Sequence, residues 1–424
     1  MKMSLRLERV LFLFVVFLCC ASSGWAIDLA GMQKLALNNR QVISQYMTSL
    51  QQSEKDITLA QGGYYPSVNI GYTANSLNEA TPLGEARENS VVAGSISWNI
   101  FSGFRDKYNV QSAEKQRQVA EYQLEGIRQD VQLNVALAYL TVSERWANRQ
   151  VAETAFQTLE KVYRDGESRF QVGLIGRNDL LKFRVDYDNA DITLKAADAG
   201  LKKSVNGLAR QVGSEIKLAD LDFADFKNLP SSVNKDEYLH KMLVARSEIK
   251  ALESVIDANR ARSTAAKSGY YPKLDVVGSY SNYSDNYINS SGSSKDEEYR
   301  AQLVLSMNLF QGFTTEASVA RAKLATRSAQ YELDELKNGL VTELNNLYID
   351  FEVSLENVGV ARRSIEQAEE NLRITQLKYN EGLERESDLL AAITNLSRAK
   401  YNHVAALQTA FLNNFKLIRM VDGF

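Results

Sequence analysis

The stretch Ser306-Met-Asn-Leu-Phe-Gln-Gly-Phe313 ends a run of alternating apolar and polar residues and begins a long segment with helical spacing. An echo of it, Ser97-Trp-Asn-Ile-Phe-Ser-Gly-Phe104, occurs 209 residues earlier and is identical at five of eight positions. That separation is about half of the 424-residue chain. The sequence therefore predicts an internal duplication, centred on a junction between strand and helix.

Two predicted strands precede each copy of the motif. Their apolar and polar residues alternate, as in a strand whose two faces meet different surroundings. The first strand of each pair opens on the same triplet, Tyr64-Tyr65-Pro66 or Tyr270-Tyr271-Pro272, where the missing N–H of proline does least harm. A polar loop joins the strands of each pair. The predicted strands span about residues 64–76, 91–101, 272–284 and 299–310.

The rest of the chain predicts helices, because it is poor in the residues that break them; there are only four prolines in all. Single helices are expected over 28–62 and 235–268, and helical hairpins over 105–212 and 315–420. A helix of about 60 residues would be ~90 Å long. That length is typical of coiled-coil-like packing rather than of an ordinary globular core.

The turns of the two predicted hairpins also match. Arg169-Phe-Gln-Val-Gly-Leu174 corresponds to Lys378-Tyr-Asn-Glu-Gly-Leu383 at the same separation of 209 residues. The chain is thus expected to contain a first repeat at 27–234, which ends in a small equatorial segment at 213–234, and a second repeat at 235–424.

The first 26 residues are expected to be a cleaved signal peptide. Basic residues precede a short apolar core, and Gly24-Trp-Ala26 supplies the small residues of a cleavage site. The only cysteines, Cys19 and Cys20, fall inside this segment, and neither follows the small residue that a lipoprotein signal requires. The mature chain would then contain no disulfide and would be held together by packing.

Composition excludes several classes of function. The formal net charge of −3 gives no electrostatic case for nucleic acid. The two histidines, His240 and His403, each stand alone on a helical stretch. No glycine-rich phosphate loop and no metal-ligand spacing is present in the sequence. We therefore expect no enzyme activity, no catalytic residues, no cofactor and no metal.

The predicted strands are about ten residues long, which is the length of a strand that crosses a membrane. Four such strands cannot close a barrel, and lipid does not tolerate an open sheet edge. Several chains would then share one barrel with cyclic symmetry. Two, three or four chains would supply eight, twelve or sixteen strands, and the spacing does not choose among them. A soluble β-layer with one wet face is the alternative interpretation of the same alternation.

In the membrane interpretation, the apolar face of each strand meets lipid and the polar face lines a wet lumen. Phe101 and Phe310 then stand where an aromatic girdle is expected. Local packing between strand and helix is the alternative role for these two residues.

This duplicated plan resembles the TolC family of outer-membrane efflux and secretion ducts over residues 28–420. The two Tyr-Tyr-Pro triplets, the two Asn-hydrophobic-Phe-x-Gly-Phe junctions and Arg169–Leu174 carry the resemblance. It implies an α+β membrane protein, a homotrimer with a twelve-stranded transmembrane β-barrel and long antiparallel hairpins that form a periplasmic α-barrel. It also implies outer-membrane lipid, a periplasmic adaptor (membrane fusion) protein and an inner-membrane ABC or RND-type pump as partners.

By this resemblance the two hairpin turns form the periplasmic tip, where the adaptor docks and the entrance opens. Gly173 and Gly382 are expected to cap their helices in the left-handed conformation. Val172, Leu174 and Leu383 beside them are expected to be exposed apolar contacts for the adaptor. Capping and docking are compatible roles, and these five residues form the predicted docking site.

Two acids stand near the start of the second helix of each hairpin, Asp179 and Asp388. One interpretation makes them first-turn acids after the N-caps Asn178 and Ser387, favoured by the helix dipole. In a trimer Asp388 would also form a ring of three carboxylates at the entrance, an arrangement that selects and binds cations.

The resemblance assigns Tyr379 to an aromatic position of the gate. The family often has a basic residue two positions after the turn glycine, where this chain has Glu384 followed by Arg385. A latch between Arg385 and Asp179 is therefore a hypothesis. The family often has a second acid one turn into the last helix, where this chain has Ala391, so a weaker cation filter is expected.

The function expected from the sequence is a channel-tunnel that exports substrates delivered by an adaptor and an inner-membrane pump. Type I protein secretion and multidrug efflux both remain open, and the absence of a lipid-modified cysteine leans slightly away from the lipoprotein drug ducts. A coiled-coil outer-membrane adhesion or tethering protein without transport is the alternative. It would explain the long helices but not the strands.

Overall fold

The computed structural model describes residues 27–80, 87–226, 228–230, 233–287 and 297–424 of the chain. The expected signal peptide, residues 1–26, lies outside this part. The chain divides into two compact units, each assembled from both halves of the sequence. Unit 1 takes the residues up to Ile43, Arg128–His240 and Thr342–Phe424, and unit 2 takes Ser44–Ile127 and Lys241–Val341.

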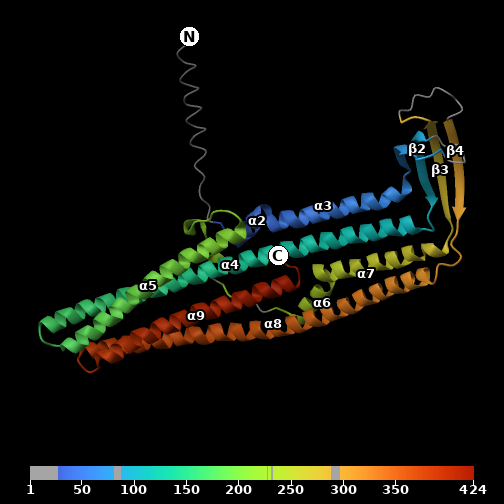
Figure 1. The fold of residues 1–424 in the computed structure, drawn as a ribbon. Coiled ribbons are helices and arrows are strands. Elements are labelled where there is room, and N and C mark those ends of the chain that lie inside the picture. Colours follow the sequence, from blue (N-terminus) through green and yellow to red (C-terminus); the bar gives the residue numbers. More distant parts are fainter. Residues whose placement is uncertain (1–26, 81–86, 227, 231–232, 288–296) are drawn as a thin grey trace, which may run out of the picture. The chain divides into compact units, whose positions relative to one another are not determined.

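Unit 2 carries an antiparallel sheet of four strands in the order β1-β2-β3-β4 (Figure 1). The strands are β1 (Ser67–Ser76), β2 (Glu88–Phe101), β3 (Lys273–Ser284) and β4 (Glu297–Ser306). Ser67 lies opposite Ser97 in the first pair, and Lys273 lies opposite Ser306 in the second. These are equivalent positions of the duplicated sequence, so the duplication extends to the register of the strands.

The repeated motif forms the same turn in both halves. Gly103 and Phe104 have φ angles of 66° and 67°, and Gly312 and Phe313 have φ angles of 59° and 62°. This left-handed conformation is common for glycine and costly for phenylalanine. Each phenylalanine packs edge-to-face on the one three residues before it, with ring centroids 5.1 Å apart in the first turn and 5.5 Å in the second. The aromatic pair helps to offset the strain of each turn.

The fourth strand is shorter than predicted, because β4 ends at Ser306 rather than near residue 310. Its equivalent, β2, continues to Phe101 because its last residues pair with β3, where Asn99 lies opposite Asp275. Among the described residues β4 has no strand on its outer side, so its ladder stops where its pairing with β3 stops. The first strand begins at Ser67 rather than 64, because Gly62–Tyr64 form a short 3-10 turn, η1.

Helices form the rest of both units. They are α2 (Leu29–Asn39), α3 (Gln41–Gln61), α4 (Arg105–Gln171), α5 (Arg177–Val212), α6 (Lys235–Ala245), α7 (Ser247–Ala266), α8 (Thr314–Asn380) and α9 (Glu386–Met420). The hairpins predicted over 105–212 and 315–420 are α4–α5 and α8–α9 (Figure 1). In the part of the chain that the structure describes, no helix is both long and apolar enough to span a membrane.

The helices expected over 28–62 and 235–268 are each interrupted, at Arg40 and Arg246. Both residues have an extended backbone with ψ of 121°. The Nη1 of Arg40 donates to the carbonyl oxygen of Arg210 at 2.9 Å, and Arg246 pairs with Glu248 at 2.9 Å. Arginine is a good helix former, so helical spacing alone gives no sign of these breaks. The break at Arg40 coincides with its contact to Arg210, a residue remote in sequence.

The equatorial segment, which belongs to unit 1, packs on the other residues of that unit through short turns rather than regular elements. Ile27 forms a parallel bridge with Leu221, and the 3-10 turn η3 (Ala224–Phe226) places Phe226 edge-to-face on Phe411 of α9 at 5.0 Å. Tyr139 of α4 is fully buried beneath it and donates to the carbonyl oxygen of Asp222. Residues 227 and 231–232 of the predicted segment lie outside the described part.

Candidate functional site at the hairpin turns

The two hairpin turns of unit 1 have the same backbone structure. Gly173 and Gly382 have φ angles of 76° and 71°, which confirms the predicted left-handed caps. In the first turn the N–H of Leu174 donates to the carbonyl oxygen of Arg169 at 2.9 Å, and in the second the N–H of Leu383 donates to that of Lys378 at 2.8 Å. These are Schellman motifs, which satisfy the last carbonyls of α4 and α8.

The acids that follow each turn cap the next helix, but not from the positions expected. The N-caps of α5 and α9 are Gly176 and Arg385, not Asn178 and Ser387. Asp179 and Asp388 are third residues of their helices, and their Oδ2 atoms accept hydrogen bonds from the backbone N–H of the N-cap residue at 3.3 and 3.4 Å. The helices begin earlier than predicted because these carboxylates reach back to the cap residue.

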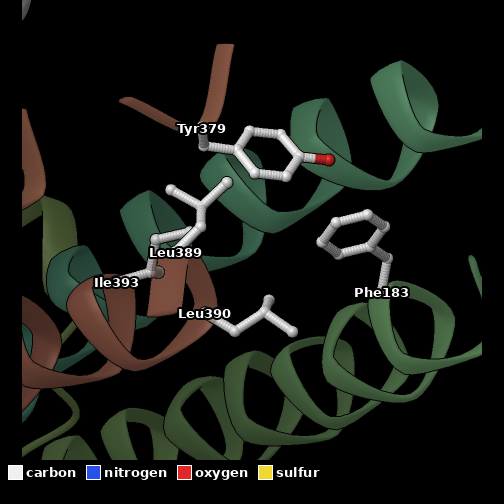
Figure 2. Packing of buried hydrophobic residues seen from close by; sticks show 5 residues of the cluster. All are labelled: Phe183, Tyr379, Leu389, Leu390 and Ile393. Carbon is white, nitrogen blue, oxygen red and sulfur yellow. The ribbon is translucent and has the colours of Figure 1, made fainter. Parts of the chain in front are cut away.

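A buried apolar cluster lies directly beneath the turns. Figure 2 shows the ring of Phe183, from α5, facing the ring of Tyr379, from the end of α8, with Leu389, Leu390 and Ile393 of α9 packed beside them. The ring centroids of Phe183 and Tyr379 are 6.3 Å apart in an edge-to-face arrangement. Because α5 belongs to the first hairpin and α8 and α9 to the second, the cluster joins the two hairpins within one chain.

Tyr379 has an unusual environment for a tyrosine. Its hydroxyl oxygen is buried and has no hydrogen-bond partner among the described residues. The guanidinium of Arg169 lies 4.9 Å from the ring centroid, and its Nη2 donates to Oδ1 of the neighbouring Asn380 at 3.3 Å. Burial raises the pKa of Tyr379, and Arg169 opposes this rise. The residue is therefore neutral and carries a donor with no acceptor in the single chain.

Ion pairs surround the cluster. The Nζ of Lys182 on α5 contacts Oε1 of Glu386 on α9 at 2.5 Å and Oδ1 of Asp179 at 3.6 Å. The hydrogen bond from Lys182 is the main cause that lowers the pKa of Glu386. Lys182 and Glu386 thus form a second link between the two hairpins, on the solvent side of the apolar one.

The structure places the predicted latch residues apart from one another. Glu384 pairs with Lys378 of the same turn at 3.0 Å, and Asp179 interacts with Lys182. Arg385 is exposed and forms no ion pair within the described part of the chain. The Arg385–Asp179 latch remains a prediction, and Asp388 is exposed as a carboxylate ring would require.

The apolar residues of the turns are exposed. Val172, Leu174 and Leu383 have exposed fractions of 70%, 73% and 77%. Their exposure leaves them accessible to a partner surface, and docking of an adaptor here remains a prediction.

Sequence reasoning missed Arg169, Lys182, Phe183 and Glu386. The repeat itself holds a signal for Lys182 and Phe183, because the equivalent residues of the second half are Ala391 and Ala392. At these two positions the halves differ in side-chain size, which is a signal that the local environments of the two hairpins differ. Arg169 and Glu386 become recognisable only after the hairpins are placed side by side.

A duplicated chain that joins a four-stranded antiparallel sheet to two very long helical hairpins defines an outer-membrane export channel of the TolC type. The chain belongs to the outer membrane efflux protein family, whose model matches residues 33–214 and 238–420. The predicted family and fold class are thereby confirmed.

Individual relatives agree with this assignment. Protein CyaE of Bordetella pertussis is 24% identical over 378 residues, 87% of this chain and 78% of that protein. The outer membrane efflux protein BepC of Brucella suis is 22% identical over 391 residues, 89% of this chain and 83% of that protein. The structure of CusC, studied for transmembrane channel formation, is 16% identical with a TM-score of 0.82, and the match covers 93% of this chain and 92% of that one.

The protein is accordingly an outer-membrane channel for efflux or secretion, with a tunnel that extends into the periplasm. Channels of this family are trimeric and work with adaptor proteins and inner-membrane pumps. The family and the structural neighbours are channels and not enzymes.

Proposed function

We propose that the hairpin turns are the periplasmic entrance of this channel, and that the entrance opens when the α4–α5 and α8–α9 hairpins separate. The observation that carries the proposal is the double link between the hairpins at the turns. The buried Phe183–Tyr379 contact and the partly exposed Lys182–Glu386 ion pair hold the same two hairpins together. A closed entrance within one chain needs such a link, and an opening movement must break it.

In a homotrimer three such ends would converge. Asp388 would then contribute one carboxylate from each chain to a ring that binds cations at the entrance. Arg385, exposed and without an ion pair in the described chain, is available to contact an acid of a neighbouring chain, with Asp179 as the proposed partner. The hydroxyl of Tyr379 is proposed as a second gate contact. It has no acceptor among the described residues of its own chain, and because it is buried there, it can meet an acceptor of another chain only if the hairpins shift.

The adaptor is proposed to dock on the apolar turn residues Val172, Leu174 and Leu383, with Gly173 and Gly382 fixing the turns that present them. A periplasmic adaptor protein that covered these side chains would bury apolar surface directly beside the link between hairpins. Docking there could weaken the link and couple entry to an inner-membrane pump of the ABC or RND type. The protein's own role is passive, with no catalytic step.

Single-channel conductance in planar bilayers tests this entrance. The double variant Arg385→Ser, Tyr379→Phe should conduct more than the wild type, because it removes the proposed contacts between chains. Tyr379→Phe alone removes a buried hydroxyl that is unpaired in the single chain, which is near neutral for the fold. Any gain in conductance from it would therefore come from a contact outside the chain.

Arg177→Ser is the matched control. It removes an exposed positive charge from the start of α5, outside the proposed latch, and should leave conductance unchanged. Unchanged conductance in the double variant would exclude Arg385 and Tyr379 as gate residues.

A deletion strain tests which class of cargo the channel exports. Loss of a secreted protein in that strain would indicate type I secretion, and gain of sensitivity to small toxic compounds would indicate multidrug efflux.

A further inference from the structure

A cavity of about 490 Å³ lies in unit 1 between α4, α9 and residues 218–226 of the equatorial segment. Its volume is within the range of small-molecule sites, about 300–1,000 Å³. Ala147, the lining residue of α4 nearest to the hairpin turn, is ~36 Å from the end of that helix at Gln171. The cavity is therefore separate from the proposed entrance.

The wall that the equatorial segment contributes is held in place by contacts remote in sequence. The N–H of Ile27 donates to the carbonyl oxygen of Asp220 at 2.7 Å, and Ile27 forms a parallel bridge with Leu221. The hydroxyl of Tyr139 on α4 donates to the carbonyl oxygen of Asp222. The cavity is thus preformed, as small-molecule sites usually are.

Aromatic rings from all three elements line the cavity. Trp146 of α4 packs on Phe223 with ring centroids 5.8 Å apart, and Phe226 packs on Phe411 of α9 at 5.0 Å. The faces of such rings attract cations. Trp146 is 41% exposed, so the aromatic lining reaches the protein surface and leaves a path for entry.

The charged residues of the lining are all acidic. They are Glu144 and Asp222, and no lysine or arginine is found among the described residues that line the cavity. Glu144 is half-buried; its Oε1 accepts a hydrogen bond from Nδ2 of Asn148 at 3.2 Å, and it forms no ion pair within the described chain. A half-buried carboxylate without a counter-ion is available to pair with a positively charged ligand.

The cations of this region line a neighbouring cavity instead. Arg149, Lys202 and Lys217 line that second cavity, which has a volume of about 530 Å³ and shares Trp146 with the first. Arg149 is paired there with Asp198 at 2.7 Å. Trp146 therefore stands between an acidic cavity and a basic one, and the acidic one is suited to a cation.

We propose that the acidic cavity binds a small organic cation, a quaternary ammonium or protonated amine on an apolar body. The apolar body packs against Phe226 and Phe411, and the positive group lies between the ring of Trp146 and the carboxylate of Glu144. The bound cation bridges the equatorial segment to α4 and α9. This site is additional to the entrance, and binding to it requires no step of export.

Equilibrium dialysis tests the binding with the purified channel in nanodiscs of zwitterionic lipid. The probe is naphthylmethyltrimethylammonium, measured by its own fluorescence, and empty nanodiscs correct for its uptake by lipid. Naphthylmethanol and naphthylacetate are the neutral and anionic analogues. The cation should bind saturably, and both analogues should bind at least about tenfold more weakly, because only the cation gains from the carboxylate.

Three variants locate the site. Glu144→Gln keeps an acceptor for Asn148 and removes the charge, so it should weaken binding of the cation at least about tenfold and leave that of naphthylmethanol nearly unchanged. Glu160→Gln is the matched control, because it removes an acid of α4 that pairs with Arg164 outside the cavity; binding should be unchanged. Ala147→Phe fills the cavity and should abolish binding of both probes.

A preference for the cation that is lost in Glu144→Gln and kept in Glu160→Gln supports the site. The proposal is overturned by absence of saturable binding, by equal affinity for the cation and naphthylmethanol, or by an unchanged affinity in Glu144→Gln. Stronger binding of naphthylacetate would assign the ligand to the basic cavity and overturn it as well. If Ala147→Phe does not fold, the two glutamine variants still decide. Because none of these measurements uses conductance, failure here leaves the proposed entrance standing.

Discussion

The two halves of this chain share one sequence plan, but equivalent residues differ in burial. The half that is more buried at the strand-to-helix junction is not the half that is more buried at the hairpin turn. At the strand-to-helix junction Gly103 of the first copy is covered, whereas Gly312 of the second is open. At the hairpin turns the order is reversed. Phe170 of the first turn is 39% exposed, and its equivalent Tyr379 is buried at 7%.

This reversal teaches that duplication copies the local structure and not the neighbours. Backbone turns, caps and register recur because they depend on nearby residues, and they do so with φ angles within about ten degrees. Which copy is covered depends on the element beside it, and at the junctions the chain places such an element beside the first copy alone. The uncovered copies therefore mark the surfaces offered to other molecules.

The largest expected effect is at the turns, where a buried and an exposed aromatic residue of the first hairpin can be compared. Phe183 is 1% exposed beneath Tyr379, so Phe183→Ala should cost about 3–5 kcal/mol in local packing. Phe170→Ala, at an exposed site, should cost about 0.5 kcal/mol or less. Limited proteolysis of the purified channel should show faster cleavage at the turns in the first variant alone. Equal cleavage in both would mean that the apolar cluster does not hold the hairpins together.

The two junction glycines provide the next comparison. Gly103→Ala adds a Cβ atom 2.8 Å from a backbone oxygen, which is a steric clash. It also places an alanine in the left-handed conformation, which costs about 1–2 kcal/mol. The folded chain should therefore be poorly recovered. Within the chain, Gly312→Ala meets only the cost of a left-handed alanine, so the variant should fold. Its trimer should dissociate at a lower temperature than the wild-type trimer. Gel analysis after stepwise heating measures this. A Gly312→Ala trimer as heat-resistant as the wild type would contradict a covered second junction.

Most of the fold could be predicted from the sequence because local signals carry it. Alternation at 64–76 and 299–310, the two Gly-Phe motifs and the turn glycines gave the strands, the junctions and the caps. The helix breaks at Arg40 and Arg246 could not be predicted, since arginine fits a helix and the first break coincides with a contact to Arg210 that is 170 residues away. The end of β4 at Ser306 likewise could not be predicted, because it coincides with the end of the pairing of β4 with β3 and no described strand lies on the outer side of β4.

The site was predictable only where the motif itself defined it. Gly173 and Gly382 lie where expected, because a left-handed cap is a property of the turn. The pairing of Lys182 with Glu386 depends on how α5 packs beside α9, and no spacing within either helix encodes it. For the same reason the sequence does not predict that Asp179 pairs with Lys182 in the single chain, at 3.6 Å.

A smaller effect is expected from the exposed ion pair. The hydrogen bond from Lys182 lowers the pKa of the Glu386 carboxyl. The pair therefore stabilises the closed entrance fully at pH values above the ordinary glutamate pKa of about 4.3. This stabilisation is lost as the pH falls through the lowered pKa. Conductance should be constant near neutrality and rise below about pH 4, whereas Glu386→Gln should conduct more at neutral pH with no further rise. Glu384→Gln is the control, because Glu384 pairs within one turn. A wild-type conductance that is flat to pH 3 would exclude a closing role for this pair.

The smallest expected effect compares the two equivalent acids, Asp388 and Asp179. Asp388 is exposed and forms no ion pair among the described residues, whereas Asp179 is half-buried beside Lys182, whose charge offsets its own. Asp388→Asn should therefore weaken block of the channel by polyvalent cations, and Asp179→Asn should change it less. The change should be modest, because a wet ring is screened by water and salt. Equal block in the wild type and Asp388→Asn would place the cation site elsewhere, and a larger effect of Asp179→Asn would assign the ring to the first half of the chain.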